Sequence, residues 1–355
     1  MAGTALVVGA SGIVGGATAA SLVERGWTVH GLARRPGLQP GVTPVLADLL
    51  DAADTAAALA GIRPNAVFIT TWLRRPTEAD NIRINAAMVR NLLDGLPKPA
   101  GPRHVALVTG LKHYLGPFEA YAKAPAETPF RESQDRLPYE NFYYVQEDIL
   151  FTAAEQQGFT WSVHRPHTMI GFALGNAMNM GVTLAIYGSI CRETGRPFVF
   201  PGSPQQYDGV TDVTDARLLG RHVAWSVTEP AARNEAFNTV NGEVFRWRQL
   251  WKRVAEGLGV AAAQYPGEAN PLVGRMADAD EVWTTLVAKH DLAPYKASEL
   301  ASWWHTDADL GRTVETFADM GKSRKAGFLD FQDSAESFHD LFATLRERRI
   351  IPPLD

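Results

Sequence analysis

The stretch that decides the fold reads Gly9-Ala10-Ser11-Gly12-Ile13-Val14-Gly15. It joins an apolar run at 5–8, typical of a strand, to an amphipathic run at 14–24, typical of a helix. Glycines at this spacing permit a tight turn, close approach of a pyrophosphate and close packing of helix on strand. The helix N-terminus then faces the anionic phosphates. We therefore expect a Rossmann fold that binds a dinucleotide through Gly9, Ser11, Gly12, Ile13, Val14 and Gly15.

The alternation of apolar runs and amphipathic stretches continues through the first half of the chain. Solid apolar strands separated by helices predict a parallel sheet covered on both faces. The fold class is therefore α/β, a doubly wound parallel Rossmann sheet with a smaller, interleaved, helix-rich C-terminal lobe. We expect residues 1–165 to form the Rossmann domain, a later strand near 236–240 to return to it, and 166–355 to be mostly a substrate-binding lobe. The expected strands of the first half are 5–8, 28–32, 44–46, 66–70, 105–108 and 160–164.

The end of the second strand indicates which dinucleotide is bound. Arg34 and Arg35 follow that strand, where an acidic residue would favour NAD and a guanidinium favours the 2′-phosphate of NADP. NADPH is therefore the expected cofactor. Asp48, after the third strand, either contacts the adenine or is an acid at a helix N-terminus. Thr70 and Trp72 follow the fourth strand at the edge where the cofactor crevice should open.

Composition limits the classes of partner. The 355 residues carry a formal net charge of -5, and no basic run suggests nucleic acid or a membrane surface. The single cysteine, Cys191, cannot form an internal disulfide and is expected to be a buried small hydrophobe, which fits a reducing cytoplasm. No signal peptide or membrane span is expected. His164 and His167 lack a third ligand, so no metal site is expected.

Short-chain dehydrogenases usually carry Tyr-x-x-x-Lys on one helix, and here the pattern is broken. The candidate helix begins Phe142-Tyr143-Tyr144, and Asp148 stands where a lysine would follow Tyr144. A cation can come instead from Lys112, which follows Thr109 and Gly110 after the fifth strand, at the carboxyl end of the sheet. The glycine spacing, G-x-x-G-x-x-G, resembles that of extended and atypical short-chain dehydrogenases.

Longer motifs resemble one family, the progesterone 5β-reductase/iridoid synthase group. They are G-A-S-G-I-V-G at 9–15, A-R-R-P at 33–36, T-G-L-K-H-Y-L-G-P-F at 109–118, N-F-Y-Y-V-Q-E-D-I-L at 141–150, W-S-V-H-R-P at 161–166, N-E-A-F-N at 234–238 and G-F-L-D-F at 327–331. The resemblance implies NADPH-dependent reduction of activated carbon–carbon double bonds in enones and enals. It maps the family's catalytic lysine onto Lys112 and its tyrosine onto Tyr144, which would also touch the cofactor. We interpret Tyr143 as a helix packing residue.

In the implied reaction, hydride adds to the β-carbon and Tyr144 donates to the oxygen that becomes anionic, while Lys112 adds positive field. The loop after the sixth strand, with Pro166 and Ile170, should line the nicotinamide. Phe118 matches a pocket aromatic of the family, and His305 stands where the family has a gating phenylalanine. Met178 and Met180 are either flexible pocket lining or ordinary core. A small hydrophobic enone or enal is the expected substrate, and a homodimer is possible.

Two other functions stay open from the sequence. One is an extended short-chain dehydrogenase acting on a carbonyl, an alcohol or a nucleotide sugar, as an epimerase or dehydratase. That function expects Tyr-x-x-x-Lys. The other is a non-catalytic NADP-binding sensor, which would not need a tyrosine beside the nicotinamide.

Overall fold

The computed structural model describes residues 2–35, 39–98, 101–117, 127–175 and 178–354. The chain forms two compact units, each built from separate stretches of sequence. Unit 1 comprises 1–167, 216–239 and 318–330, and unit 2 comprises 168–215, 240–317 and 331–355. Phe118 lies outside the described residues.

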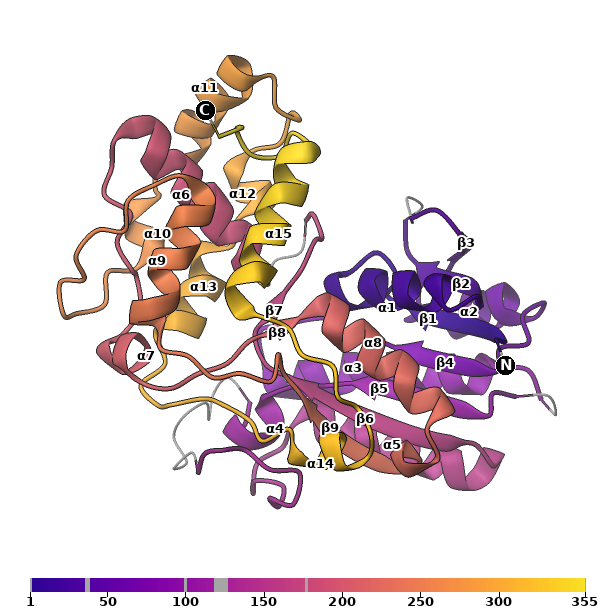
Figure 1. The fold of residues 1–355 in the computed structure, drawn as a ribbon. Coiled ribbons are helices and arrows are strands. Elements are labelled where there is room, and N and C mark those ends of the chain that lie inside the picture. The colour runs from indigo at the N-terminus through magenta and orange to yellow at the C-terminus, as the bar shows by residue number, and fades with distance from the viewer. Residues whose placement is uncertain (1, 36–38, 99–100, 118–126, 176–177, 355) are drawn as a thin grey trace. The chain divides into compact units, whose positions relative to one another are not determined.

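Unit 1 contains a parallel sheet of seven strands in the order β3-β2-β1-β4-β5-β6-β9 (Figure 1). The chain order reverses between β1 and β4, which is where such sheets open a crevice at their carboxyl ends. β1, β4 and β5 are almost wholly buried, because helices cover both faces. The predicted fold class is confirmed. The strands are β1 (Thr4–Val8), β2 (Thr28–Ala33), β3 (Val42–Leu46), β4 (Ala66–Ile69), β5 (His104–Val108), β6 (Thr160–Pro166) and β9 (Glu235–Thr239).

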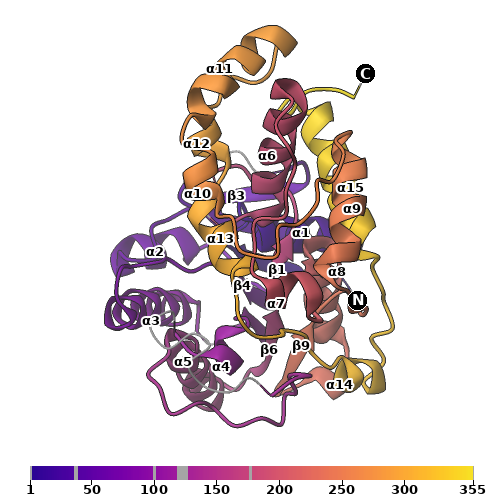
Figure 2. The same ribbon diagram turned by 90° about the vertical axis from the view of Figure 1, so that its left-hand side faces the viewer.

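The helices of unit 1 pack in two layers. One pairs α1 with α8, and the other joins α2, α3 and α5 (Figure 2). Gly220 allows close packing in the first layer, because a β-carbon there would lie 2.7 Å from the carbonyl oxygen of Ala17. The helices are α1 (Ile13–Glu24), α2 (Ala52–Leu59), α3 (Glu78–Gly95), α4 (Lys112–Leu115), α5 (Phe142–Gln157), α8 (Ala216–Thr228), the 3₁₀ helix η1 (Pro230–Ala232) and α14 (Gly321–Lys325).

Unit 2 is mainly helical and is built around α6, which packs against α9 and α15. Cys191 in α6 is 1% exposed and burial raises its pKa to about 11, so it is the small hydrophobe that the sequence predicted. No helix among the described residues is long and apolar enough to cross a bilayer. The elements are β7 (Met169–Ile170), α6 (Met180–Thr194), α7 (Pro204–Asp208), β8 (Thr214–Asp215), α9 (Trp247–Leu258), α10 (Leu272–Arg275), α11 (Ala279–His290), α12 (Ala297–Leu300), α13 (Trp303–Leu310) and α15 (Ser334–Glu347).

A chain of buried histidines and serines runs beneath α8 in unit 1. The Ser226 hydroxyl donates to the carbonyl of Val223 at 2.8 Å, so its contact with Ser162 at 3.1 Å must use the proton of Ser162. Ser162 therefore accepts from Nε2 of His164 at 2.9 Å, and the same hydroxyl lies 3.0 Å from Nε2 of His104. The His164 imidazole then carries its single proton on Nε2, whereas Nδ1 of His104 lies 2.9 Å from the Thr160 hydroxyl.

The same reasoning assigns the proton of the next histidine, His222. Nδ1 of His164 is left as an acceptor, so Nδ1 of His222 donates to it at 2.8 Å. Nε2 of His222 then accepts from the Ser323 hydroxyl at 3.0 Å. Burial lowers the pKa of His104 to about 4 and that of His222 to about 3, and it holds the pKa of His164 well below its usual range. All three rings are neutral at pH 7.

This chain predicts acid sensitivity. Because the folded pKa values lie below the unfolded value of about 6.5, the unfolded state binds more protons as pH falls, and stability present above about pH 6.5 is lost toward pH 4. Each histidine contributes a slope of about 1.4 kcal/mol per pH unit. Urea unfolding between pH 7 and 4.5 measures it. His104→Gln should reduce the slope by about one proton and His30→Gln should not; equal slopes in both variants would contradict the assignment.

Candidate active site

The glycine turn after β1 has the shape that a dinucleotide needs. Gly9 adopts φ of 89°, and a β-carbon on Gly15 would lie 2.1 Å from the Gly9 carbonyl oxygen, so α1 can pass this close only over glycine. Helix α1 begins after Gly12 with no side-chain cap and no acidic residue in its first turn. Its N-terminal dipole and amides can therefore hold an anion. These residues, with the exposed Ser11 beside them, fit a pyrophosphate.

The residues predicted for the adenosine end follow β2 and β3. Arg34 and Arg35 are exposed directly after Ala33, the last residue of β2. Asp48 is exposed, and its carboxylate accepts from the amide of Leu50 at 3.0 Å. The N-cap of α2 is Asp51, whose carboxylate accepts from the amides of Ala53 and Asp54. The helix N-terminus, one of the two roles considered for Asp48, is therefore filled by Asp51, and contact of Asp48 with adenine stays a prediction.

An aromatic pair and a lysine meet beyond the ends of β4 and β5. Trp72 stacks on Phe142 with ring centroids 5.0 Å apart. The Lys112 ammonium lies 5.1 Å from the ring centroid of Trp72 and 4.8 Å from that of Phe142, close enough for attraction by both ring faces. Lys112 is 6% exposed, so its cation is held at a defined place rather than free in solvent. Nearby, the Thr70 hydroxyl donates to the carbonyl of Val8 at 2.7 Å.

The turn that carries Lys112 is fixed at three successive residues. Its carbonyl accepts from Nδ2 of Asn141 at 2.7 Å, and the next carbonyl, of His113, accepts from the Tyr144 hydroxyl at 2.6 Å. The Tyr114 hydroxyl donates to Oδ1 of Asn238 at 2.6 Å. All of these groups are buried. Thr109 is bound further back, where its amide donates to the carbonyl of His164 at 2.8 Å.

The start of α5 is fixed in the same way. The amide of Phe142 donates to Oε1 of Glu78 at 2.7 Å, and the amide of Tyr143 donates to Oδ1 of Asn141 at 3.0 Å. These bonds satisfy two of the helix's unpaired N-terminal donors. Asn141 therefore joins the Lys112 turn to the helix that carries both tyrosines.

The two adjacent tyrosines have different surroundings. Besides donating to His113, the Tyr144 hydroxyl accepts from the amide of Leu137 at 3.0 Å, so its proton is committed to the backbone. The Tyr143 hydroxyl lies 3.5 Å from the point where a β-carbon on Gly110 would stand, and the carbonyl oxygen of Pro166 lies 3.3 Å from that point. Tyr143 is thus the tyrosine at the carboxyl ends of β5 and β6.

A buried carboxylate that sequence reasoning missed lies under this turn. Glu147 is 1% exposed and lies near Arg136, Arg165 and His113, at 2.9, 3.5 and 3.8 Å. Burial, helped by the positive charges of Arg165 and Arg136, lowers the pKa of His113 to about 3. The available signal was the spacing, because Glu147 follows Tyr143 by four residues and so shares its helix face.

The remaining predicted residues belong to unit 2. Ile170 in β7 is 1% exposed. Met180 is 1% exposed in the hydrophobic core, while Met178 is half-buried. Nε2 of His305 lies 3.9 Å from Oδ2 of Asp309, one helical turn along α13. The placement of these residues in a substrate pocket stays a prediction.

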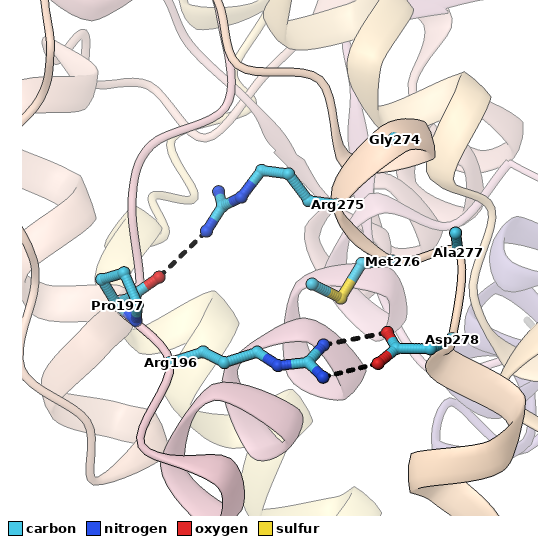
Figure 3. Close-up of a pocket in the computed structure, with 7 residues that line it drawn as sticks. All are labelled: Arg196, Pro197, Gly274, Arg275, Met276, Ala277 and Asp278. Atoms are coloured by element: carbon cyan, nitrogen blue, oxygen red, sulfur yellow. Dashed lines mark hydrogen bonds and ion pairs between the residues drawn. The ribbon is translucent and has the colours of Figure 1, made fainter.

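Unit 2 also contains a pocket of about 510 Å³ lined by residues 196–197 and 274–278. Figure 3 shows Arg196 paired with both carboxylate oxygens of Asp278, at 2.9 and 2.5 Å, and Arg275 donating to the carbonyl of Pro197 at 3.0 Å. Both guanidiniums are satisfied by the protein itself, and none of the predicted site residues lines this pocket. We do not assign it to the active site.

The parallel sheet and the glycine turn after β1 define a Rossmann fold. Solved structures agree on the fold: UDP-glucose 4-epimerase from Bifidobacterium longum, in complex with NAD+ and UDP, has a TM-score of 0.69 at 14% identity, covering 98% of this chain and 99% of that one. A short-chain dehydrogenase/reductase superfamily protein from Agrobacterium tumefaciens with bound NAD has a TM-score of 0.65 at 16% identity, covering 98% of each chain.

Relatives identify the family. A (S)-8-oxocitronellyl enol synthase from Camptotheca acuminata is 38% identical over 98% of this chain and 93% of that protein. A 3-oxo-Delta(4,5)-steroid 5-beta-reductase from Arabidopsis thaliana is 37% identical, with the same coverage. Residues 69–352 match the PRISE-like Rossmann-fold domain. The chain therefore belongs to the PRISE-like family. This confirms the predicted resemblance and supports the prediction that the chain is an oxidoreductase.

The glycine turn gives a matched pair of variants. Gly15→Ala should abolish dinucleotide binding, because its β-carbon would lie 2.1 Å from the Gly9 carbonyl oxygen. Gly16→Ala meets nothing closer than 3.6 Å and should bind normally, while helix propensity stabilises it by up to about 1 kcal/mol. Fluorescence titration with NADPH and thermal unfolding measure the two effects. Normal NADPH binding by Gly15→Ala would refute the role given to this turn.

Proposed function

We propose that the chain is an NADPH-dependent reductase of activated carbon–carbon double bonds in small hydrophobic enones and enals. The observation that carries this is that a buried ammonium, Lys112, and a phenol, Tyr143, both lie just beyond β5: Lys112 follows the strand, and the Tyr143 hydroxyl lies beside Gly110. The relatives support it: the name of the steroid reductase describes reduction at C5 of a double bond conjugated with a 3-oxo group, which is the β-carbon of an enone.

NADPH is the proposed cofactor. The glycine turn at 9–15 would hold its pyrophosphate, and Arg34 and Arg35 would pair with its 2′-phosphate. Bound NADPH supplies the hydride for the β-carbon. The roles of Thr70, Trp72, Thr109, Gly110, Pro166 and Ile170 beside the cofactor remain part of the proposal.

We propose Tyr143 as the hydrogen-bond donor to the substrate oxygen, which revises the assignment of Tyr144 made from the sequence. The proton of Tyr144 is directed at the carbonyl of His113, and breaking that bond would leave a buried carbonyl without its donor. The Tyr143 hydroxyl lies beside Gly110, at the edge where catalytic groups of such sheets gather. In this assignment Tyr144 holds the turn and Tyr143 serves the reaction.

The chemistry asked of these residues is stabilisation of negative charge. When the β-carbon gains a hydride, the carbonyl oxygen becomes an enolate oxygen, and a neutral phenol with a nearby ammonium stabilises it. The phenol does not need to ionise, because it donates a hydrogen bond rather than removing a proton. The lysine one turn after the tyrosine in alcohol-oxidising relatives, which lowers the phenol's pKa, is therefore not needed. The α-carbon would then take its proton from solvent.

The test of this function is a substrate panel with two tyrosine variants. Wild type should oxidise NADPH with 2-cyclohexenone or a steroid enone and yield the saturated ketone. Tyr143→Phe should lower kcat by about 10²–10³ with little change in NADPH affinity. Tyr144→Phe should lower stability by about 1 kcal/mol and kcat far less. Gas chromatography of products, steady-state kinetics and thermal unfolding give these quantities.

Three results would each contradict a different part. Turnover of aldehydes or ketones alone, with alcohol as the product, would favour a carbonyl reductase. NADPH binding without turnover of any substrate would favour a sensor. A larger loss of kcat in Tyr144→Phe than in Tyr143→Phe would restore Tyr144 as the donor.

The preference for NADPH has its own test. Replacing Arg34 and Arg35 together by Ala should weaken NADPH binding at least about tenfold, since two charge-assisted contacts to phosphate are lost, and should leave NADH binding nearly unchanged. Titration of both cofactors measures the ratio of affinities. An Arg25→Ala variant, at the far end of α1, is the control for lost surface charge. An unchanged ratio would mean that the two arginines do not read the phosphate.

A further inference from the structure

Glu147 occupies the helix position that ordinarily carries a lysine in short-chain dehydrogenases, four residues after the tyrosine that we assign to the reaction. Residues at this spacing share one helix face, so Glu147 and Tyr143 lie on neighbouring turns of the same side of α5. Glu147 is 1% exposed. A carboxylate this deeply buried is stable only when cations and hydrogen-bond donors compensate for its lost hydration.

Two arginines from different segments provide that compensation. Oε2 of Glu147 lies 2.9 Å from Nη2 of Arg136, and its Oε1 lies 3.5 Å from Nη2 of Arg165 at the end of β6. Arg136 also binds Asp148 at 2.8 Å, so two carboxylates balance two guanidiniums. His113 adds no charge at neutral pH, because its pKa is about 3.

Each arginine also touches a side chain that fixes the Lys112 turn. Nη1 of Arg165 donates to the Tyr114 hydroxyl at 3.4 Å, which in turn donates to Asn238. The Arg136 guanidinium lies 4.9 Å from the ring centroid of Tyr144, the residue whose hydroxyl holds the carbonyl of His113. Glu147 is thus the common counter-ion of both arginines. Arg165 contacts Tyr114 directly, and Arg136 contacts Tyr144, which holds His113; His113 and Tyr114 are the two residues directly after Lys112.

We propose that Glu147 is a positioning residue for the proposed reaction: as the buried counter-ion of Arg136 and Arg165, it keeps the Lys112 turn in register with Tyr143. This inference rests on the proposed function. It explains how this chain can place its cation on a turn rather than on the helix. The helix position is used to hold that turn, and a lysine there would face two arginines.

The charge of Glu147 also sets the electrostatic field at the site. Without it, Arg165 and Arg136 would leave one uncompensated positive charge beside the Lys112 turn, and a nearby positive charge disfavours an ammonium. Any loss of activity at high pH should then begin at a lower pH. Other titratable or charged groups also lie in this part of the site. They are His113 and Tyr114 in α4, Glu132 and Arg136 before α5, Tyr143, Tyr144 and Asp148 in α5, and Arg165 in β6.

The experiment compares Glu147→Gln, which keeps the shape and removes the charge, with Glu155→Gln, an exposed glutamate of the same helix. Activity is expressed per NADPH-binding site, well below the unfolding midpoint of each variant. Glu147→Gln should lower kcat at pH 7 at least about tenfold, keep NADPH affinity within about threefold, and move the alkaline limb of the pH–kcat profile to lower pH. Glu155→Gln should match wild type in all three measurements.

A second variant covers the case in which Glu147→Gln does not fold. Glu147→Asp keeps the charge and should show the wild-type alkaline limb with a partial loss of kcat. Two results would overturn the positioning role while leaving the proposed function intact. One is an unchanged kcat per site in Glu147→Gln. The other is an alkaline limb that stays in place in Glu147→Gln but moves in Glu147→Asp. A wild-type protein that reduces no enone would overturn the proposed function and this inference together.

Discussion

The structure depends on how one short buried turn satisfies its polar groups. Residues 112–114 lie at the carboxyl end of β5, where parallel strands deliver functional side chains, yet water is excluded there. A buried carbonyl without a donor is costly, so each must be paired. Asn141 and Tyr144 from α5 supply donors to two successive carbonyls, and Asn238 from β9 accepts the hydroxyl of Tyr114. Hydrogen bonds at residues 112–114 thus join the end of β5 to α5 and to β9.

The same arrangement determines where the charged side chains around this turn can lie. A buried Glu147 makes sense only with Arg136 and Arg165 around it, and those arginines leave no place on this helix face for a lysine. The cation that we propose for the site is instead Lys112, which lies against the ring faces of Trp72 and Phe142. The proposed reduction needs a donor and a positive field but not an ionised phenol, so a cation on a separate turn suffices for it.

Local patterns predicted most of the Rossmann unit. The glycine turn at 9–15 and the solid apolar runs of β1, β4 and β5 are short-range signals, and the parallel sheet follows from them. The return of a strand near 236–240 to the sheet was also expected, and β9 pairs with β6 there. The choice between Tyr143 and Tyr144 was not predictable in this way, because adjacent helix residues differ by about 100° in direction and either can face the crevice. Glu147 was missed because its partners are 11 and 18 residues away in sequence.

The sequence by itself determined the class of fold, the dinucleotide turn and the candidate Lys112. Each depends on a short run of consecutive residues whose types are restricted by steric or electrostatic requirements. Only the tertiary structure decided which tyrosine donates to the His113 carbonyl, which nitrogen of His164 carries a proton, and which cations surround Glu147. Those outcomes depend on hydrogen bonds between segments far apart in the chain, and a donor's single proton can be assigned only when all of its neighbours are known.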